Sequence, residues 1–264
     1  MAKHRDVGRE TVGRMQSFDS DGIRIAYRDE GKGEPILLIH GFASNTATNW
    51  ADTRWISFLV ERGRRVIAFD NRGNGMSEKF YDPSLYGAPD MAEDALRLLD
   101  HLGIKRADVL GYSMGARIAA FLALRHPERV RSLVLGGLGI NMVRGMVGSG
   151  PLAKALEADS IEEVTNDTAR SFRAFAEQTG SDLKAMAACM RGPRERILPE
   201  QLATIKLPVL VAVGTKDVIG GSGAELAKLI PGAQLLEIEG RDHMKAVGDA
   251  SFKQGVLDFL TKRA

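Results

Sequence analysis

The amino-acid sequence predicts an α/β fold: a mostly parallel sheet with helices on both faces and a helical cap insertion. Three observations support this prediction. Short runs of apolar residues recur along the chain, as expected of strands buried on both faces of a parallel sheet. Segments with helical periodicity separate these runs. One long stretch has helical patterns and no strand-like run, and it lies between two of the predicted strands.

The fold is expected to begin with antiparallel β structure, because residues 17–27 alternate apolar and polar side chains around the turn signal Ser20-Asp21-Gly22. Since helical segments alternate with the later apolar runs, those strands should form βα units with right-handed crossovers. The later strands are predicted at 36–39, 66–69, 109–110, 133–135, 209–213 and 235–238.

Three helices are predicted outside the insertion. A helix over 90–102 is expected because Asp90 and Glu93 have capping-box spacing and Gly103 follows as a stop signal. The segment 116–124 is apolar nearly all round, which predicts a buried helix. The last helix has one apolar face, made by Phe252, Val256, Phe259 and Leu260.

The strand-free stretch 138–205 is predicted to be a helical cap over the carboxyl edge of the sheet, where open α/β sheets bind ligands. Ser160 and Ser181 are expected to open two of its helices. The predicted organisation is an N-terminal tail at 1–16 and a core made by 17–137 and 206–264, with the cap between the two parts of the core.

Composition and charge argue against several classes of protein. The chain has 264 residues, with 36 Lys and Arg against 34 Asp and Glu, and this balance is not typical of proteins that bind nucleic acid or anionic lipid. Cys189 is the single cysteine, which excludes an intrachain disulfide and a cysteine-based metal cluster. Neither a secretory signal nor an apolar run of membrane-spanning length is visible. We expect a soluble cytoplasmic protein, monomeric or homodimeric.

The strongest local motif is Gly111-Tyr112-Ser113-Met114-Gly115, which lies between a predicted strand and the buried helix. A serine in a G-x-S-x-G pattern at a strand-to-helix turn is held in a strained conformation that exposes its Oγ. The flanking positions need glycine because side chains there would collide with the neighbouring strand and helix. The helix N-terminus favours a developing oxyanion. Ser113 is therefore predicted to be a nucleophile.

A serine nucleophile needs a base, and His243 is selected from the five histidines. His243 lies in a polar loop after the last predicted strand. The other four have different expected positions: His4 in the tail, His40 bracing a loop, and His101 and His126 at helix ends.

The acid that orients His243 is expected between Ser113 and His243 in the chain. Asp217 comes just after the strand at 209–213, so it should reach the same edge of the sheet. Asp242 is adjacent to the histidine and too close in sequence to turn back easily onto its ring. Asp217 is therefore predicted to complete a Ser-His-Asp triad.

Two backbone N–H groups are predicted to form an oxyanion hole, that of Met114 after the nucleophile and that of Phe42 in the loop 40–45. The cap is expected to enclose a flexible, aliphatic substrate pocket. The substrate-binding residues predicted there are Met142, Met146, Phe172, Met186 and Met190.

These motifs together resemble the α/β-hydrolase superfamily, in its ester-hydrolase-like branch with a helical cap. The matching segments are His40-Gly41-Phe42, the loop 70–77, the motif at Ser113, the segment 206–217 and His243. The resemblance implies the triad named above and gives Asp70 and Arg72 structural roles. A serine nucleophile in place of an aspartate argues against the haloalkane dehalogenase and epoxide hydrolase relatives.

The expected function is hydrolysis of a small-molecule carboxylic ester of short-to-medium acyl chain, through an acyl-enzyme and without a metal or organic cofactor. Two alternatives stay open. The same triad serves cofactor-free perhydrolases, haloperoxidases and hydrolases of carbon–carbon bonds. A non-catalytic ligand receptor could also retain the triad.

Overall fold

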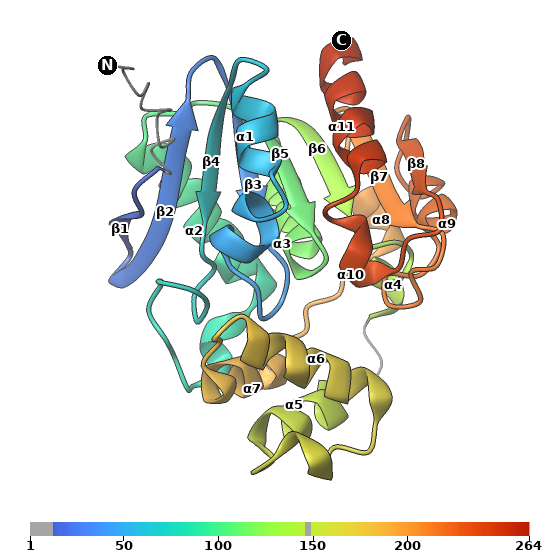
Figure 1. Ribbon diagram of the computed structural model, residues 1–264. Coiled ribbons are helices and arrows are strands. Elements are labelled where there is room, and N and C mark those ends of the chain that lie inside the picture. The colour runs from blue at the N-terminus through green and yellow to red at the C-terminus, as the bar shows by residue number, and fades with distance from the viewer. Residues whose placement is uncertain (1–12, 146–148, 264) are drawn as a thin grey trace, which may run out of the picture.

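The computed structural model describes residues 13–145 and 149–263. In this part of the chain, eight strands form one sheet in the order β1-β2-β4-β3-β5-β6-β7-β8 (Figure 1). The predicted α/β fold with a mostly parallel sheet is confirmed. In chain order the strands are β1 (Gln16–Ser20), β2 (Ile23–Gly31), β3 (Glu34–Ile39), β4 (Arg64–Phe69), β5 (Ala107–Tyr112), β6 (Val130–Gly136), β7 (Val209–Gly214) and β8 (Gln234–Ile238).

The first two strands form the predicted antiparallel hairpin. Asp21 and Gly22 have φ values of 57° and 83°, as a tight two-residue turn requires. Strand β2 also pairs with β4 in antiparallel fashion, and the other pairs in the sheet are parallel. The tail predicted at 1–16 lies mostly outside the described residues, and Gln16 already belongs to β1.

Helices lie on both faces of the sheet and beyond one of its edges (Figure 1). Single turns of 3₁₀ or π helix lie at Ala47–Ala51, Pro83–Tyr86, Pro127–Arg129 and Ile161–Glu163. The α-helices are α1 (Trp55–Val60), α2 (Ala88–His101), α3 (Met114–Arg125), α4 (Asn141–Arg144), α5 (Ser149–Glu157), α6 (Asp167–Gln178), α7 (Leu183–Arg191), α8 (Pro199–Leu202), α9 (Gly223–Ala227), α10 (His243–Ala246) and α11 (Ala250–Lys262).

The two faces of the sheet are covered by different helices because side chains alternate along each strand. In β3, Leu37 and Ile39 pack in one buried cluster with residues of α2 and α3. Ile36 and Leu38 pack in a second cluster with residues of α1 and α11. This two-sided burial accounts for the continuous apolar runs from which the strands were predicted.

Three predicted helix starts are wrong by a few residues. Helix α2 begins at Ala88 rather than Asp90, because Pro89 is well suited to the first turn of a helix. Ser160 caps only the short 3₁₀ turn, and Asn166 caps α6 through its side chain. Asp182, rather than the neighbouring serine, accepts a hydrogen bond from the first turn of α7.

Helices α5, α6 and α7 form a layer, the helical layer, beyond the carboxyl ends of the parallel strands (Figure 1). Its apolar cluster is separate from the two clusters of the sheet. Both ends of the segment predicted as a cap, 138–205, pack into the sheet core instead, through Leu138 and Met142 at one end and Ile197 and Leu202 at the other. The helical layer is therefore shorter than the predicted cap.

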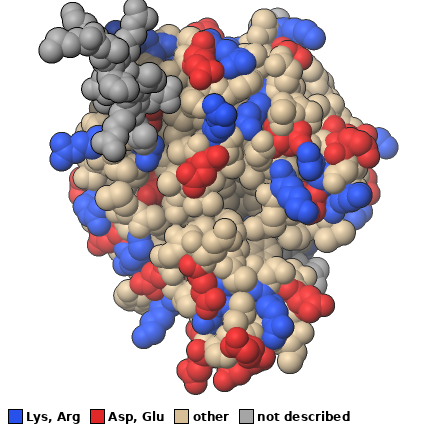
Figure 2. Space-filling model, in the orientation of Figure 1, with Lys and Arg blue, Asp and Glu red and all other residues tan. Residues whose placement is uncertain are grey.

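The surface carries charges of both signs. On the face drawn in Figure 2, Lys and Arg side chains are interspersed with Asp and Glu, in line with the near balance of charges in the sequence. Among the described helices, none combines the length and the apolar character needed to cross a membrane.

Candidate active site

Ser113 lies at a sharp turn between β5 and α3, in the backbone conformation φ 56°, ψ −116°. A positive φ strains any residue with a side chain, so the surrounding packing must hold it. A Cβ on Gly111 would lie 2.1 Å from the carbonyl oxygen of Gly115, and a Cβ on Gly115 would lie 2.0 Å from that of Ile39. Both distances are too short for any side chain. The two glycines of the motif are therefore required by the close approach of strand and helix.

His243 connects the other two residues of the predicted triad. Its Nε2 lies 2.9 Å from Ser113 Oγ, and its Nδ1 lies 2.8 Å from Asp217 Oδ2. Beside a carboxylate, Nδ1 carries the proton, which leaves Nε2 free to accept the proton of the serine hydroxyl. The structure thus brings together three side chains from positions far apart in the sequence.

Asp217 is held by the loop that follows β7. Its Oδ1 accepts hydrogen bonds from the backbone N–H groups of Ile219, at 2.9 Å, and Gly220, at 2.7 Å. The two donors fix the carboxylate so that Oδ2 faces the histidine ring. Asp217 and His243 are both buried, which shields their interaction from solvent.

Asp242 has a different role from its neighbour in sequence. Its Oδ1 accepts from the N–H groups of Met244 and Lys245, so it caps the short helix α10 that begins at His243. The Tyr112 hydroxyl donates a hydrogen bond to the carbonyl oxygen of His243 at 2.6 Å. Sequence reasoning did not identify this contact, which ties the histidine to the residue before the nucleophile.

The two amides predicted to form an oxyanion hole belong to residues on the wall of the same cavity as Ser113. Within the described part of the chain, neither the Phe42 nor the Met114 N–H donates to a protein acceptor. The loop that carries Phe42 passes close to the nucleophile, since a Cβ on Gly41 would lie 3.3 Å from the Cβ of Ser113. Both amides are therefore available to a ligand beside Ser113.

Buried polar contacts support this loop. His40 Nε2 accepts from the Asn71 N–H at 2.9 Å, and burial lowers the pKa of His40, which keeps the ring neutral. Asp70 accepts from two backbone N–H groups, and Arg72 binds both carboxylate oxygens of Asp94. These contacts agree with the structural roles expected for His40, Asp70 and Arg72.

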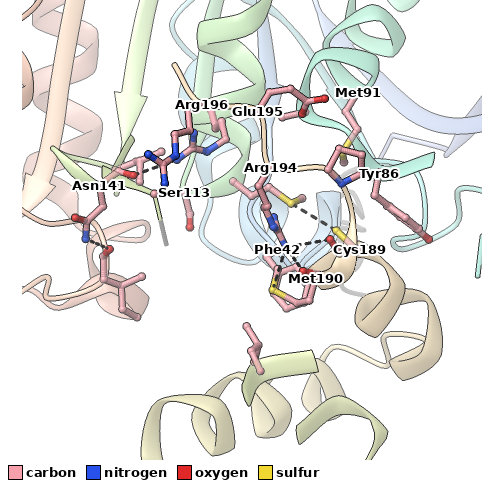
Figure 3. A pocket seen from close by; sticks show the side chains of 18 of the residues that line it. Phe42, Tyr86, Met91, Ser113, Asn141, Cys189, Met190, Arg194, Glu195 and Arg196 are labelled. Atoms are coloured by element: carbon pink, nitrogen blue, oxygen red, sulfur yellow. Dashed lines mark hydrogen bonds between the residues drawn. The ribbon is translucent and has the colours of Figure 1, made fainter. Parts of the chain in front are cut away.

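A cavity of about 220 Å³ opens beside Ser113, between the sheet edge and the helical layer (Figure 3). Phe172 and Met190 lie on its wall, as predicted. The prediction was wrong for Met142 and Met186, which are fully buried elsewhere. Met142 packs in the sheet core, and Met186 packs inside the helical layer one turn before Met190. Met146 lies outside the described residues.

The wall of the cavity is also more polar than the predicted aliphatic lining. Apolar side chains such as Phe42, Met91 and Leu152 share it with charged and amide groups. The sequence prediction missed these groups because it followed the apolar faces of the helices and did not consider the segment after α7. Besides Ser113, the described polar side chains on the wall are Tyr86, Arg117, Asn141, Arg144, Arg194, Glu195 and Arg196.

Comparison with known proteins places the chain in a family. A model of the alpha/beta hydrolase fold matches residues 34–146. A 2-hydroxy-6-oxo-2,4-heptadienoate hydrolase from Pseudomonas putida is 30% identical over 196 residues, which cover 70% of each chain. The chain belongs to the α/β-hydrolase family. The resemblance inferred from the motifs is therefore confirmed at the level of the family.

Two further similarities bear on function. A 2-hydroxymuconate semialdehyde hydrolase from a Pseudomonas species is 38% identical over 154 residues, 58% of this chain. The match spans about half of that relative's length, 48%. The crystal structure of an esterase from Rhodococcus sp. ECU1013 superposes with a TM-score of 0.77 at 25% identity, covering 96% of this chain and 99% of the esterase.

Proposed function

We propose that this protein is a serine hydrolase that cleaves small carboxylic esters of short-to-medium acyl chain. The observation that carries the proposal is the continuous hydrogen-bonded relay from Ser113 Oγ through His243 to Asp217, with distances of 2.9 and 2.8 Å. Nucleophile, base and orienting acid within hydrogen-bond reach are the pattern of an activated serine. The similarity to an esterase of known structure supports the same assignment.

In the proposed reaction, Ser113 Oγ attacks the ester carbonyl while His243 Nε2 takes its proton. Asp217 stabilises the imidazolium that forms, and the N–H groups of Phe42 and Met114 bind the oxyanion. His243 then donates the proton to the departing alcohol, which leaves the acyl group on Ser113. Water, activated by His243, attacks this acyl-enzyme and releases the acid.

The cavity supports the proposed range of acyl lengths. Its volume, about 220 Å³, is smaller than the roughly 300–1,000 Å³ of pockets that hold drug-sized ligands. Each methylene that the acyl chain buries contributes about 0.8 kcal/mol until the space is filled. The value of kcat/KM should therefore rise from acetyl to butyryl or hexanoyl esters and then fall.

The direct test uses p-nitrophenyl esters with acyl chains from C2 to C16 and the variant Ser113→Ala. We expect the substitution to lower kcat about 10⁴-fold or more, because the members of a triad act as a unit. Ser57→Ala is a matched control, since the Ser57 hydroxyl bonds only within α1 and its preceding turn. If Ser113→Ala keeps a tenth of the activity, Ser113 is not the nucleophile. A maximum of kcat/KM at C12 or longer contradicts the small cavity.

Hydrolysis of a carbon–carbon bond is the second candidate. It is favoured by the two relatives named above, a 2-hydroxymuconate semialdehyde hydrolase and a 2-hydroxy-6-oxo-2,4-heptadienoate hydrolase. A ring-cleavage dienone whose colour is lost on cleavage separates the candidates when it is assayed beside the ester series. A kcat/KM for the dienone that exceeds the best ester by tenfold or more replaces ester hydrolysis as the assignment.

A further inference from the structure

Arg117, on the cavity wall, differs from several other arginines in its lack of an ion pair with any described carboxylate. Arg64, Arg72 and Arg173 each form an ion pair with a carboxylate. Arg144, on the rim of the cavity, pairs with Glu225. Arg117 is half-buried on the cavity wall, and among the described residues it forms no ion pair. Because a buried charge is normally paired, this guanidinium is suited to bind an anion.

Arg117 lies on the same cavity wall as the predicted nucleophile, Ser113. Ser113 is the N-cap of α3, and Arg117 lies in the first turns of this helix. A single guanidinium nitrogen donates to a described protein acceptor, the carbonyl oxygen of Asn141 at 3.1 Å. A guanidinium has five N–H donors, so most of those on Arg117 remain for a ligand.

Arg194 adds a second positive charge at the same cavity. The exposed segment after α7 carries it, and its Nη2 donates to the carbonyl oxygens of Cys189 and Met190 at 3.1 and 2.6 Å (Figure 3). These bonds satisfy the end of α7 and hold the guanidinium at the mouth of the cavity. Burial and, to a smaller degree, the charge of Arg194 lower the pKa of Arg117. An anionic ligand would relieve this repulsion between two cations.

Among the described residues of the cavity wall, Glu195 carries the one carboxylate, and it pairs with neither Arg117 nor Arg194. Glu195 lies toward the start of α2, where a Cβ on Gly87 would come within 3.6 Å of its Oε1 and 2.8 Å of Asp90 Oδ2. Arg196, also on the wall, adds further positive charge. The charges of the cavity therefore favour an anion over a neutral or cationic group.

We propose that the acyl part of the substrate ends in a carboxylate, which Arg117 binds inside the cavity and Arg194 attracts at its mouth. The acyl part is the part that stays on Ser113 after the alcohol leaves, so the cavity beside Ser113 must hold it. Apolar residues on the wall contact its methylene groups. The substrate class is thus the half-ester of a dicarboxylic acid, an assignment that rests on the proposed ester hydrolysis.

The test compares kcat/KM for p-nitrophenyl hemiadipate with that for p-nitrophenyl heptanoate, a neutral ester of similar length. We expect the wild-type protein to prefer the anionic ester at least tenfold. Arg117→Gln should lower this preference by about 10- to 100-fold, the size expected for a charged hydrogen bond. Arg194→Gln, at an exposed position, should lower it by a smaller factor, and it also serves if the Arg117 variant does not fold.

A matched control removes one charge far from the site. Arg62 is exposed in the loop before β4, at the opposite edge of the sheet, so Arg62→Gln should leave the preference unchanged. The proposal is overturned if wild type shows no preference for the anionic ester. It is equally overturned if both Arg117→Gln and Arg194→Gln keep the wild-type preference.

Calorimetry tests the carboxylate-binding site independently of the proposed ester hydrolysis. Ser113→Ala is titrated with p-nitrophenyl hemiadipate, and the titration is repeated in the double variant that adds Arg117→Gln. Binding that weakens tenfold or more in the double variant supports the anion site even if neither ester is cleaved. Absence of binding to Ser113→Ala overturns the anion site, whereas cleavage of the neutral ester alone leaves the proposed reaction intact.

Discussion

The turn around Ser113 and the helical layer face each other across the cavity, but they are constrained in different ways. At the turn, Gly111 and Gly115 have no space for even one added carbon. In the layer, no described residue has an atom within 4 Å of a Cβ added to Gly150. The turn is thus fixed by backbone contacts that admit one residue type, whereas the start of α5 leaves room for an added carbon.

The largest effect is expected at Asp217, the acid of the relay. Asp217→Asn should lower kcat by about 10³-fold or more, because an amide presents the wrong partner to His243 Nδ1. Asp242→Asn is the matched control. It caps α10, so it should cost about 1 kcal/mol of stability at most and leave kcat within about tenfold. Steady-state kinetics and urea unfolding of both variants measure this difference, and reversed kinetic effects would mean that Asp242 is the acid.

Substitution of glycine at the turn and in the helical layer gives the next largest difference. Gly115→Ala should lower the free energy of unfolding by at least about 3 kcal/mol, because the new Cβ would lie 2.0 Å from the backbone oxygen of Ile39. Gly150→Ala lies in α5 with open space around it and should raise that free energy by up to about 1 kcal/mol. Urea unfolding curves measure both. Equal effects of the two substitutions would contradict the difference in packing between the turn and the start of α5.

Cys189 in α7 reports how often the helical layer opens. Burial raises the pKa of its thiol to about 11, so the thiolate that reacts with iodoacetamide is scarce near neutral pH. Alkylation of the folded protein at pH 8 should be on the order of 100-fold slower than that of a peptide cysteine. The rate should rise about tenfold per pH unit, because each unit below the pKa costs a factor of ten in thiolate.

The control for this measurement is the same protein in urea, where Cys189 should react at the rate of a peptide. A folded protein that reacts at the peptide rate would show that the helical layer opens often enough to expose the wall of the cavity. In that case the small, enclosed acyl site would not describe the protein in solution.

The sequence predicts the sheet and the turn at Ser113 better than it predicts the wall of the cavity, for a physical reason. Each predicted strand lies within its observed bounds, because strands buried on both faces must be apolar throughout. Strand β8 is the exception to this burial, since most of its residues are exposed. Ser113 could be found because its strained turn demands a recognisable pattern. Helix starts were less certain, because Ser160 and Asn166 have similar capping ability and because α2 begins before Asp90 without any side-chain cap.

The wall of the cavity could not be predicted in the same way. Met142 and Met186 follow helical periodicity, but periodicity does not say which apolar face meets the sheet and which meets the ligand. Arg117 offered one signal, its spacing of four residues from Ser113 on a predicted helix. The contact between the Tyr112 hydroxyl and the His243 carbonyl, 131 residues apart, depends on the complete tertiary fold.

The wide spacing of the relay has a consequence for how activity arises as the chain is made and folds. Ser113 and His243 are 130 residues apart. A growing chain therefore carries the serine without its base until 130 further residues have been made. In refolding, the relay cannot form before β7 and β8 join the sheet, because the loops after these strands supply Asp217 and His243. Such long-range contacts close slowly. Recovery of hydrolysis should therefore lag behind recovery of helix content.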